Sequence, residues 1–412
     1  MTQIQVVGVG LDPEDLPQVI AKRIAKAEVL VGGTRLLERF KDHPGLKLPI
    51  KSPLEGIITR VKQEMLSGKE VVVLADGDPG FFGIGKRLVA AIGKEHLQFY
   101  PNVCTLQAAA ARLKIPWEDI RTISLHGRKD LSPLFRALVR EDRIGVFTDQ
   151  NFHPGRLAEA LMDRGVDTFI MHVFEDLGQK GERIGSFEIQ EAEGRSFSPL
   201  NFVLLERKKH PELSLHLGMD EDLYIHEKGL ITKREIRAAG LSMLEVQATD
   251  TVWDLGAGCG SVAIEASLLA NEGRVLAVEK NPSRCESIRL NIRRTGAYGV
   301  EVIQGRMPGC LEALDDPDRV FMGGGTRRGS GVLEEVVKRI KPGGKLVVHV
   351  VLMGSLQHAR ENLLNRGWPL TITQIQVSRS QSLAGDLRLE ALNPVYIIAA
   401  RKPIKHENTL DE

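Results

Sequence analysis

At residues 251–260 the chain reads TVWDLGAGCG, which is a run of apolar residues, one acidic residue and then glycine at every second position. A helix is predicted to begin just after it, at Ser261. Glycine has no Cβ, so alternating glycines let backbone N–H groups come close to a ligand. A dinucleotide-binding turn needs the pattern G-x-G-x-x-G, and Ser261 stands at the position of its last glycine. The stretch therefore predicts a ligand-binding turn between a buried strand and a helix, and it disfavours a dehydrogenase.

The segment after this turn supports the same interpretation. Residues 273–278 form a second apolar run, GRVLAV, which ends at Glu279. An acidic residue about 20 positions beyond such a turn is placed to accept hydrogen bonds from both hydroxyls of a ribose. Asn281 and Pro282 then suit the N-cap and the first position of a helix. The alternatives are a glycine-rich loop of some other α/β protein for the turn, and a solvated strand end for Glu279.

Taken together, D-x-G-x-G-x-G resembles the glycine motif of Rossmann-like S-adenosylmethionine (SAM) methyltransferases. Cys259 lies inside this motif, and we interpret it as a small residue that fits the turn, because no partner base is apparent.

Composition indicates a globular protein of more than one domain. The chain has 412 residues, 42% of them hydrophobic and 26% charged, and a net charge of +1. This length exceeds what one core usually organises, and the neutral charge gives no support for nucleic-acid or membrane partners. Neither a signal peptide nor a membrane span is expected. The four cysteines and the histidines show no metal-ligand spacing, so we expect no metal and a cytoplasmic location.

A charged stretch with a proline, ERKKHP at residues 206–211, separates two expected α/β domains. We predict the first domain over 1–205, a linker over 206–221, the second domain over 222–402 and a flexible tail over 403–412.

In the second domain strands and helices alternate, which predicts a mostly parallel sheet covered by helices on both faces. Helices are expected near 233–244, 261–269, 282–295 and 356–366. Further strands are expected near 300–303, 320–322 and 345–351. Strands near 370–377 and 395–400 have no helix between them, which predicts an antiparallel closing hairpin.

The first domain also alternates, but its turns are different. Strands are predicted at 4–9, 71–75 and 143–148, and each runs into a polar turn. Ligands collect at the carboxyl ends of strands in open parallel sheets, so these turns are candidate ligand loops.

Several motifs carry a family resemblance. The first domain contains GVG at 8–10, ADGDPGFFGI at 75–84, PNVCT at 101–105, ARLKIPWED at 111–119 and SLHGR at 124–128. They resemble the tetrapyrrole (class III) methyltransferases, in particular the branch that methylates precorrins in cobalamin synthesis. The second domain contains GLITKRE at 229–235, the glycine turn, and MGGG at 322–325. These resemble the decarboxylating precorrin methyltransferase subunits.

Joined in this order, the two domains resemble the family of fused precorrin-6Y methyltransferases (decarboxylating). The resemblance implies a bifunctional enzyme that methylates a tetrapyrrole at carbons 5 and 15 and decarboxylates the acetate on ring C. It assigns carbon 5 to the first domain and the other two steps to the second. It also implies one SAM per domain and a homo-oligomer.

The resemblance implies three groups of site residues. The cofactor-binding residues of the first domain are Gly8, Gly10, Asp76, Gly77, Asp78, Pro79, Asn102 and Val103. Those of the second domain are Thr232, Asp254, Gly256, Ala257, Gly258, Cys259, Gly260, Glu279, Arg306 and Met307. The substrate-binding residues are Gly323, Gly324, Gly325, Arg327 and Arg328. The sequence identifies no general base and no other catalytic residue.

Some of these positions allow a second interpretation. Asp78 either lines the cofactor pocket or caps a helix that begins near Gly83. Thr232 suits the N-cap of the helix at 233–244, with Glu235 completing a capping box, and this role is compatible with a cofactor contact. Arg306 replaces the acidic residue that many methyltransferases place against adenine, so we expect only a backbone contact there.

Several basic loops and polar turns also allow two interpretations. Thr326, Arg327 and Arg328 depart from the Ser-Gly-Gly of the decarboxylating subunits; they either pair with precorrin carboxylates or form a solvated loop. Arg379 and Arg388 either cover the substrate or solvate a hairpin. The turns at 102–105 and 148–149 are each as consistent with ordinary turn chemistry as with a site, and His126 is more consistent with a structural role.

Two other functions remain as alternatives. The first is a two-domain methyltransferase acting on another acidic small molecule or on RNA, and the neutral charge disfavours RNA. The second is a non-catalytic SAM-binding protein, which the intact glycine turns in both halves disfavour. The sequence does not distinguish a cobalt-containing from a metal-free substrate.

Overall fold

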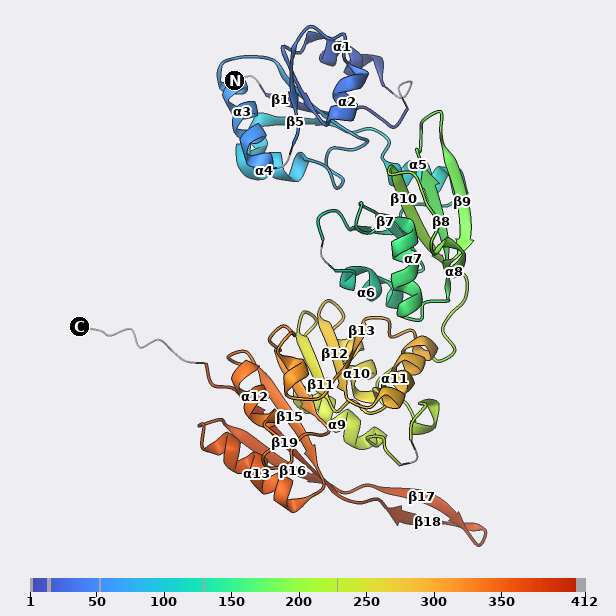
Figure 1. Cartoon of the computed structure of the whole chain (residues 1–412), viewed down its shortest axis with the longest axis vertical. Helices are drawn as coiled ribbons and strands as arrows, with labels where there is room; N and C mark the ends of the chain where they lie inside the picture. The colour runs from blue at the N-terminus through green and yellow to red at the C-terminus, as the bar shows by residue number, and fades with distance from the viewer. Residues whose placement is uncertain (1–2, 13–15, 52, 129, 228, 405–412) are drawn as a thin grey trace, which may run out of the picture. The chain divides into compact units, whose positions relative to one another are not determined.

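The chain folds into two compact units (Figure 1), and the computed structural model describes residues 3–12, 16–51, 53–128, 130–227 and 229–404. The first unit comprises residues 1–128, 142–158 and 170–206, and the second comprises 129–141, 159–169 and 207–412. Within the described residues, no helix combines the length and the apolar character needed to cross a membrane.

The first unit begins with a parallel five-stranded sheet in the order β3-β2-β4-β1-β5. Its strands are β1 (Ile4–Gly8), β2 (Val29–Gly32), β3 (Leu46–Pro49), β4 (Val71–Ala75) and β5 (Leu97–Tyr100). Its helices are α1 (Gln18–Lys26), α2 (Thr34–Arg39), α3 (Leu54–Leu66) and α4 (Gly85–Ile92), and a 3₁₀ turn, η2, spans Lys94–His96. Along β1, Val6 packs into one core cluster and Val7 into another, so helices cover both faces.

A second five-stranded sheet follows in the order β6-β7-β10-β8-β9. Its strands are β6 (Arg121–Ser124), β7 (Arg143–Phe147), β8 (Phe169–Glu175), β9 (Arg183–Glu188) and β10 (Asn201–Arg207). The helices in this part of the chain are α5 (Thr105–Leu113), α6 (Ser132–Arg140), α7 (Pro154–Asp163) and α8 (Ile189–Ala192). β6 and β7 are parallel, whereas β7 pairs with β10, and β8 with β9, in antiparallel fashion.

The second unit contains a seven-stranded sheet in the order β13-β12-β11-β14-β15-β19-β16. Its strands are β11 (Thr251–Leu255), β12 (Arg274–Glu279), β13 (Val300–Gln304), β14 (Arg319–Met322), β15 (Lys345–Val350), β16 (Leu370–Ile375) and β19 (Val395–Arg401). Its helices are α9 (Arg234–Leu244), α10 (Ser261–Leu269), α11 (Pro282–Thr295), α12 (Val332–Arg339) and α13 (Met353–Leu364), with 3₁₀ turns η3 (Glu221–Leu223) and η4 (Gly309–Leu311).

The strand order of this sheet reverses at its centre. The chain runs outward from β11 to β13 and then returns to β14, which lies on the other side of β11. In such sheets ligands bind at the carboxyl ends of the strands where the order reverses. The glycine turn after β11 and the Gly323 loop after β14 occupy that point. β19 runs antiparallel to both β15 and β16, which confirms the predicted closing hairpin.

A further hairpin, absent from the prediction, is inserted into the closing one. Its strands, β17 (Ser378–Leu383) and β18 (Asp386–Ala391), extend from the second unit in Figure 1. The backbone has positive φ at both Ala384 and Gly385, as a tight type I′ turn requires. Leucines of this hairpin are exposed, with Leu387 at 68% and Leu389 at 74%.

The predicted helices of the second unit are otherwise confirmed. α10 and α11 have the predicted bounds, and the Asn281 side chain caps α11 by accepting a hydrogen bond from the backbone N–H of Ser283 (3.0 Å). The helix predicted at 356–366 begins three residues earlier, at Met353, and ends at Leu364. No side chain caps its start, so the sequence offered no signal for that boundary.

Candidate functional site

The turn after β11 is shaped by backbone conformations that favour glycine. Gly256, Gly258 and Gly260 have φ of +75°, +59° and +81°. A Cβ on Gly256 would lie 3.2 Å from both the Cα and the backbone nitrogen of Gly324. The backbone N–H of Gly323 also donates to the carbonyl of Leu255 (3.1 Å). The predicted cofactor turn and the predicted substrate loop therefore lie against each other.

Glu279 joins the end of β12 to this turn. The side chain is buried, and one carboxylate oxygen accepts from the backbone N–H of Gly258 (3.1 Å). The other oxygen accepts from the N–H groups of Lys280 and Asn281 (2.9 Å each). A carboxylate has about four acceptor positions, so about one is left for a ligand hydroxyl.

Asp254, at the end of β11, is almost fully buried and accepts a hydrogen bond from the N–H of Ala263 (3.0 Å). Burial, with a further contribution from the charge of Glu279, raises the pKa of Asp254 to about 7. Burial also raises the pKa of the Cys259 thiol, which agrees with a packing role for that residue.

Asp254 and the turn after β11 border a cavity of about 440 Å³. Seven predicted residues line it: Thr232, Asp254, Gly256, Ala257, Gly258, Cys259 and Gly323. Gly260, Glu279, Arg306, Met307, Gly324, Gly325, Arg327 and Arg328 are not among the lining residues. The volume lies within the range of small-molecule sites.

Sequence reasoning missed several residues that line this cavity. Phe321, His349 and Val351 come from β14 and from the end of β15. Val377, Leu392 and Asn393 come from the base of the β17–β18 hairpin, and Arg284 comes from α11. Phe321 and His349 lie inside apolar strands, where a pattern of buried residues does not distinguish a pocket wall from the core.

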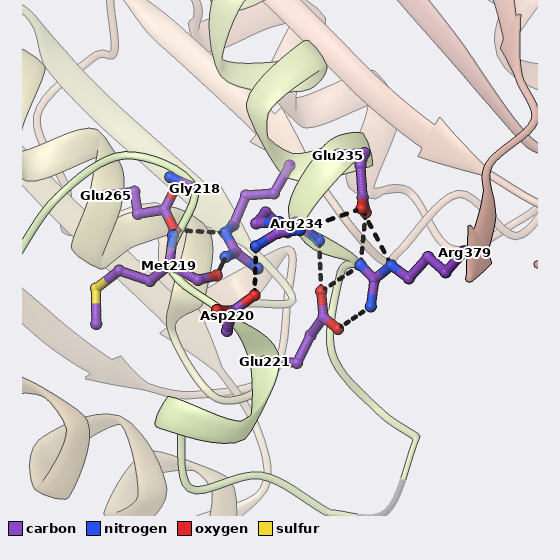
Figure 2. A network of polar contacts seen from close by, with 9 residues as sticks. Gly218, Met219, Asp220, Glu221, Arg234, Glu235, Glu265 and Arg379 are labelled. Carbon is purple, nitrogen blue, oxygen red and sulfur yellow. Dashed lines mark hydrogen bonds and ion pairs between the residues drawn. The ribbon is translucent and has the colours of Figure 1, made fainter. Parts of the chain in front are cut away.

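Arg379 ties the β17–β18 hairpin to η3 and α9. Figure 2 shows its guanidinium between two carboxylates, and it donates to Glu221 (2.7 and 2.9 Å) and to Glu235 (3.0 and 2.5 Å). The Arg379 hydrogen bonds lower the pKa of Glu221 to about 2. Of the two interpretations of Arg379, the structure supports neither substrate contact nor simple solvation, because the side chain anchors the hairpin.

The predicted N-cap of α9, Thr232, is wrong, because Glu221 caps this helix. The N-cap of this helix is Lys233, with no side-chain cap bond, and Thr232 lies outside the helix. Glu221 instead accepts from the backbone N–H of Arg234 (2.6 Å). Glu235 bonds Arg379 and does not complete a capping box. The cap comes from a residue distant in sequence, which a local motif cannot reveal.

A buried ion pair holds the segment that carries Thr232. Arg237 and Glu265 are both fully buried and lie 2.8 Å apart. Arg237 also donates to the carbonyls of Thr232 (2.7 Å) and Met219. Glu265 accepts from the backbone N–H groups of Gly218 and Met219 (2.9 and 3.1 Å). These bonds therefore hold the segment before α9, which contains Thr232, in place against α10.

The remaining predicted basic residues lie near solvent. Arg306 and Arg327 are exposed, and Arg328, 79% exposed, forms a 3.5 Å ion pair with Glu361. Met307 packs against the core of the sheet. Contact of Arg306, Arg327 and Arg328 with cofactor or substrate stays a prediction.

In the first unit the ends of β1, β4 and β5 meet. A Cβ on Gly8 would lie 1.8 Å from the carbonyl oxygen of Gly77 and 2.9 Å from the backbone nitrogen of Asn102. The Asn102 side chain donates to the carbonyl of Gly8 (3.3 Å). Gly10 and Gly77 have positive φ (+70° and +58°). The predicted loops of this domain are thus brought together.

Asp78 does not cap a helix. Its carboxylate accepts from the backbone N–H of Gly80 (2.8 Å), whereas α4 begins at Gly85 with Ile84 as its N-cap. The helix-cap alternative is therefore wrong, because the glycine-rich loop separates the acid from the helix by more than one turn.

A cavity of about 620 Å³ lies beside these loops. Of the predicted cofactor-binding residues of this domain only Asp76 lines it, and the Asp76 carboxylate pairs with Arg35 (2.6 Å). Phe82, His126 and Thr148 are further lining residues, and Phe82 is 54% exposed with φ of +51°. Gly8, Gly10, Gly77, Asp78, Pro79, Asn102 and Val103 are not among the lining residues, so their cofactor contacts stay a prediction.

Two family models match the chain, one in each half. The tetrapyrrole (corrin/porphyrin) methylases match residues 3–193, and the precorrin methyltransferase domain matches residues 222–402. A precorrin-6Y C(5,15)-methyltransferase (decarboxylating) of a Sinorhizobium species is 33% identical over 353 residues, which is 84% of each chain. The chain belongs to the precorrin-6Y C(5,15)-methyltransferase family.

Smaller proteins match part of this precorrin-6Y methyltransferase family member. A probable cobalt-precorrin-6B C(15)-methyltransferase (decarboxylating) of Saccharolobus solfataricus is 30% identical over 191 residues, covering 45% of this chain and 96% of that protein. The crystal structure of a precorrin-6Y C5,15-methyltransferase from Geobacter metallireducens shares 38% identity, covers 45% of this chain and 98% of that chain, and has a TM-score of 0.44.

Proposed function

We propose that the chain is a bifunctional SAM-dependent C-methyltransferase of corrin ring synthesis. It methylates precorrin-6B (precorrin-6Y) at carbons 5 and 15 and decarboxylates the acetate on ring C, giving precorrin-8. One observation carries the proposal: the chain joins two methyltransferase domains, and a relative that matches 84% of it is named for both methylations and for the decarboxylation.

The cavity of the second unit suits SAM. At Gly256 a Cβ would crowd the Gly324 backbone, whereas the space beside Gly258 is open for 4 Å. Thr232, Asp254 and the residues at 256–259 would hold the cofactor, and Glu279 would accept from its ribose. SAM supplies a methyl group on a sulfonium, so methyl transfer to carbon needs no metal.

The residues around this cavity would orient the reactants and exclude water. Phe321, Val351 and Val377 provide apolar walls. Orientation and exclusion of water supply much of the rate enhancement when the protein itself does little covalent chemistry. Loss of CO₂ leaves an electron pair on carbon that needs an acceptor, and the conjugated tetrapyrrole supplies one. Within the described residues we assign no general base.

We further propose that each domain binds one SAM and that each catalyses a different methyl transfer. The first domain would methylate carbon 5, with Asp76 and the loops at 8–10, 77–79 and 102–103 around its cofactor. The second would methylate carbon 15 and remove CO₂. Support comes from relatives named as C(15)-methyltransferases (decarboxylating), which match only 44–45% of this chain. The domain limits at 205 and 222 belong to the same proposal and can be tested by limited proteolysis.

A cobalt-containing substrate is the second candidate. The names of the shorter relatives specify cobalt-precorrin-6B, whereas the name of the long relative specifies precorrin-6Y. We favour the metal-free substrate because the long relative matches both domains. A cytoplasmic location, a homo-oligomeric state and the absence of nucleic-acid partners stay predictions from the sequence.

Mass spectrometry of the purified chain with SAM and precorrin-6B tests the proposal. We expect a product that has gained two methyl groups and lost one CO₂. A product formed only from cobalt-precorrin-6B would select the second candidate. Failure to alter either substrate would contradict the tetrapyrrole assignment altogether.

A further inference from the structure

His349 is a polar side chain in an otherwise apolar wall of the C-terminal cavity. It lies on β15, where Val348 packs into the main core of the sheet and His349 points to the opposite face. The residue lines the 440 Å³ cavity. Both ring nitrogens are buried and, among the described residues, neither has a hydrogen-bond partner.

The surroundings of the ring offer no polar partner of their own. The imidazole packs edge-on against Phe321, with the ring centroids 4.5 Å apart. On the α9 side it faces Gly240, where a Cβ would lie only 2.3 Å from Nε2. Glycine in a helix interior destabilises the helix, so its presence in α9 keeps space for the imidazole. Burial lowers the pKa of His349 to about 4, which keeps the ring neutral near pH 7, with one N–H donor and one acceptor.

A buried polar group without a partner destabilises the free protein. An apolar side chain of the same shape would avoid this penalty, and the neighbouring residues are apolar already. The position of the ring on the cavity wall indicates that a bound molecule supplies the missing partner.

We propose that His349 donates a hydrogen bond to a carboxylate of the molecule bound in the C-terminal cavity. The inference rests on the proposed function, because both of its ligands carry carboxylates: SAM at its amino-acid end, and the tetrapyrrole on its acetate and propionate side chains. A neutral donor orients a carboxylate without the strong charge pairing that would stabilise it against loss of CO₂.

Three substitutions test the inference in the full chain. His349→Phe keeps the ring shape and removes both nitrogens. His349→Asn and His349→Gln retain an amide donor near the Nδ1 and Nε2 positions. We expect the Phe variant without ligands to melt at or above the wild-type temperature, because an unpartnered polar group is gone. We expect either its SAM affinity or its rate of decarboxylation to fall by about tenfold to a hundredfold, which is the range of a charge-assisted hydrogen bond. At least one amide variant should recover part of that loss.

Two assays identify the source of the carboxylate. Calorimetry measures SAM affinity for the C-terminal site, in protein whose N-terminal site is blocked by Gly8→Ala. Single-turnover mass spectrometry measures decarboxylation with saturating SAM. Weaker SAM binding assigns the carboxylate to SAM. Unchanged SAM binding with a slower single-turnover decarboxylation, or with a higher precorrin concentration at its half-maximal rate, assigns it to the tetrapyrrole.

Other outcomes overturn the inference. A folded Phe variant with wild-type SAM affinity and wild-type decarboxylation would do so. So would a Phe variant that loses stability and activity together without rescue by either amide, since that result indicates packing. Gly240→Ala, which crowds Nε2, should reproduce the functional loss if the Phe variant does not fold. If the wild-type protein binds SAM but leaves precorrin unaltered, only the proposed function is contradicted. The SAM affinity of the Phe variant relative to the wild type then decides whether His349 binds a carboxylate of SAM.

Discussion

Asp254 is an acid that the folded chain keeps protonated more readily than the unfolded chain does. Its pKa rises from 3.8 to about 7 on burial. Because the folded state binds this proton more tightly, the contribution of Asp254 to the free energy of unfolding falls as the pH rises from about 4 to about 7. Each pKa unit corresponds to about 1.4 kcal/mol, so the total fall is on the order of 4 kcal/mol.

Asp254→Asn should remove this pH dependence, because an amide does not ionise and its oxygen can still accept from Ala263. Urea unfolding without SAM, at pH 5 and at pH 8, checks the prediction. We expect the wild type to lose more stability than the variant between these two values. All other titrating groups are common to both proteins, so equal losses would contradict the raised pKa.

Gly256 and Gly354 form a matched pair of glycines. Gly256→Ala forces φ of +75° on alanine and crowds Gly324, whereas a Cβ on Gly354 meets nothing within 4 Å. We expect Gly256→Ala to be destabilised by about 1–2 kcal/mol and to lose the C-terminal SAM site. Gly354→Ala, in helix α13, should bind SAM normally. Calorimetric stoichiometry should fall from two SAM per chain to one in the first variant only. Two intact sites in Gly256→Ala would show that the turn does not contact the cofactor.

At this scale the sequence predicted the residues whose chemistry follows from a short motif. Asp254, the three glycines and Glu279 all lie within 30 residues and have a fixed spacing. His349 was not predictable, because its importance comes from Gly240 and Phe321, which are distant in the sequence. Arg379 was noticed, but its partners were not, because Glu221 precedes it by more than 150 residues.

Among the elements, the β17–β18 hairpin is joined to η3 and α9 by the hydrogen bonds of Arg379. Arg379→Gln would remove two ion pairs, and the pKa of Glu221 should return toward its ordinary value. The stabilisation from this pair is present above about pH 4.5 and is lost as the pH falls toward 2, since the folded pKa is the lower one. Near neutral pH the substitution therefore has its full effect.

We expect faster amide exchange at residues 378–391 in Arg379→Gln, and weaker SAM binding at the C-terminal site by a few fold. Hydrogen exchange and calorimetry measure the two effects. Arg388→Gln is the control, because within the described part of the chain Arg388 bonds only Gln381 and Glu390, both in the same hairpin. The anchoring role would be contradicted if both variants exchanged alike.

Periodicity predicted many of the elements that bury a face, although α12, which buries Val332, Leu333, Val336 and Val337, was not among the predicted helices. The strands of the seven-stranded sheet and helices α10 and α11 have continuous or alternating apolar patterns. The β17–β18 hairpin buries neither face: β17 (SRSQSL) is polar, and the alternating leucines of β18 (DLRLEA) are exposed, so neither strand has the buried face that a periodic pattern normally marks. The prediction of the closing hairpin was confirmed because β19 is a buried apolar strand.

For the whole molecule, two independent methyl transfers are expected. In Gly8→Ala a Cβ would lie 1.8 Å from the Gly77 carbonyl, so the N-terminal loops cannot keep their arrangement. We expect this variant to transfer one methyl group to precorrin-6B and to remove CO₂. Gly256→Ala should transfer one methyl group and retain the carboxylate. Mass spectrometry of the products distinguishes the two, and loss of both activities in either variant would contradict the division of labour.

The order of the two domains was predictable from the sequence because each has its own glycine motif. The compact units do not simply follow the order of the chain, since segments 129–141 and 159–169 group with the second unit although they lie inside the first half of the chain. Such grouping depends on contacts between distant residues, which composition does not encode.

The buried pair of Arg237 and Glu265 restricts how this enzyme can evolve. Replacing either residue alone would leave an unpaired charge in the interior. This would lower the free energy of unfolding by about 3–5 kcal/mol, a large part of the 5–15 kcal/mol of a typical protein. A lineage can therefore leave this arrangement only by changing both residues nearly together, or after gaining stability elsewhere. In related chains that differ at most other positions, we expect Arg237 and Glu265 to be kept or replaced together. The same holds for the turn at Gly218 and Met219, which both residues bind.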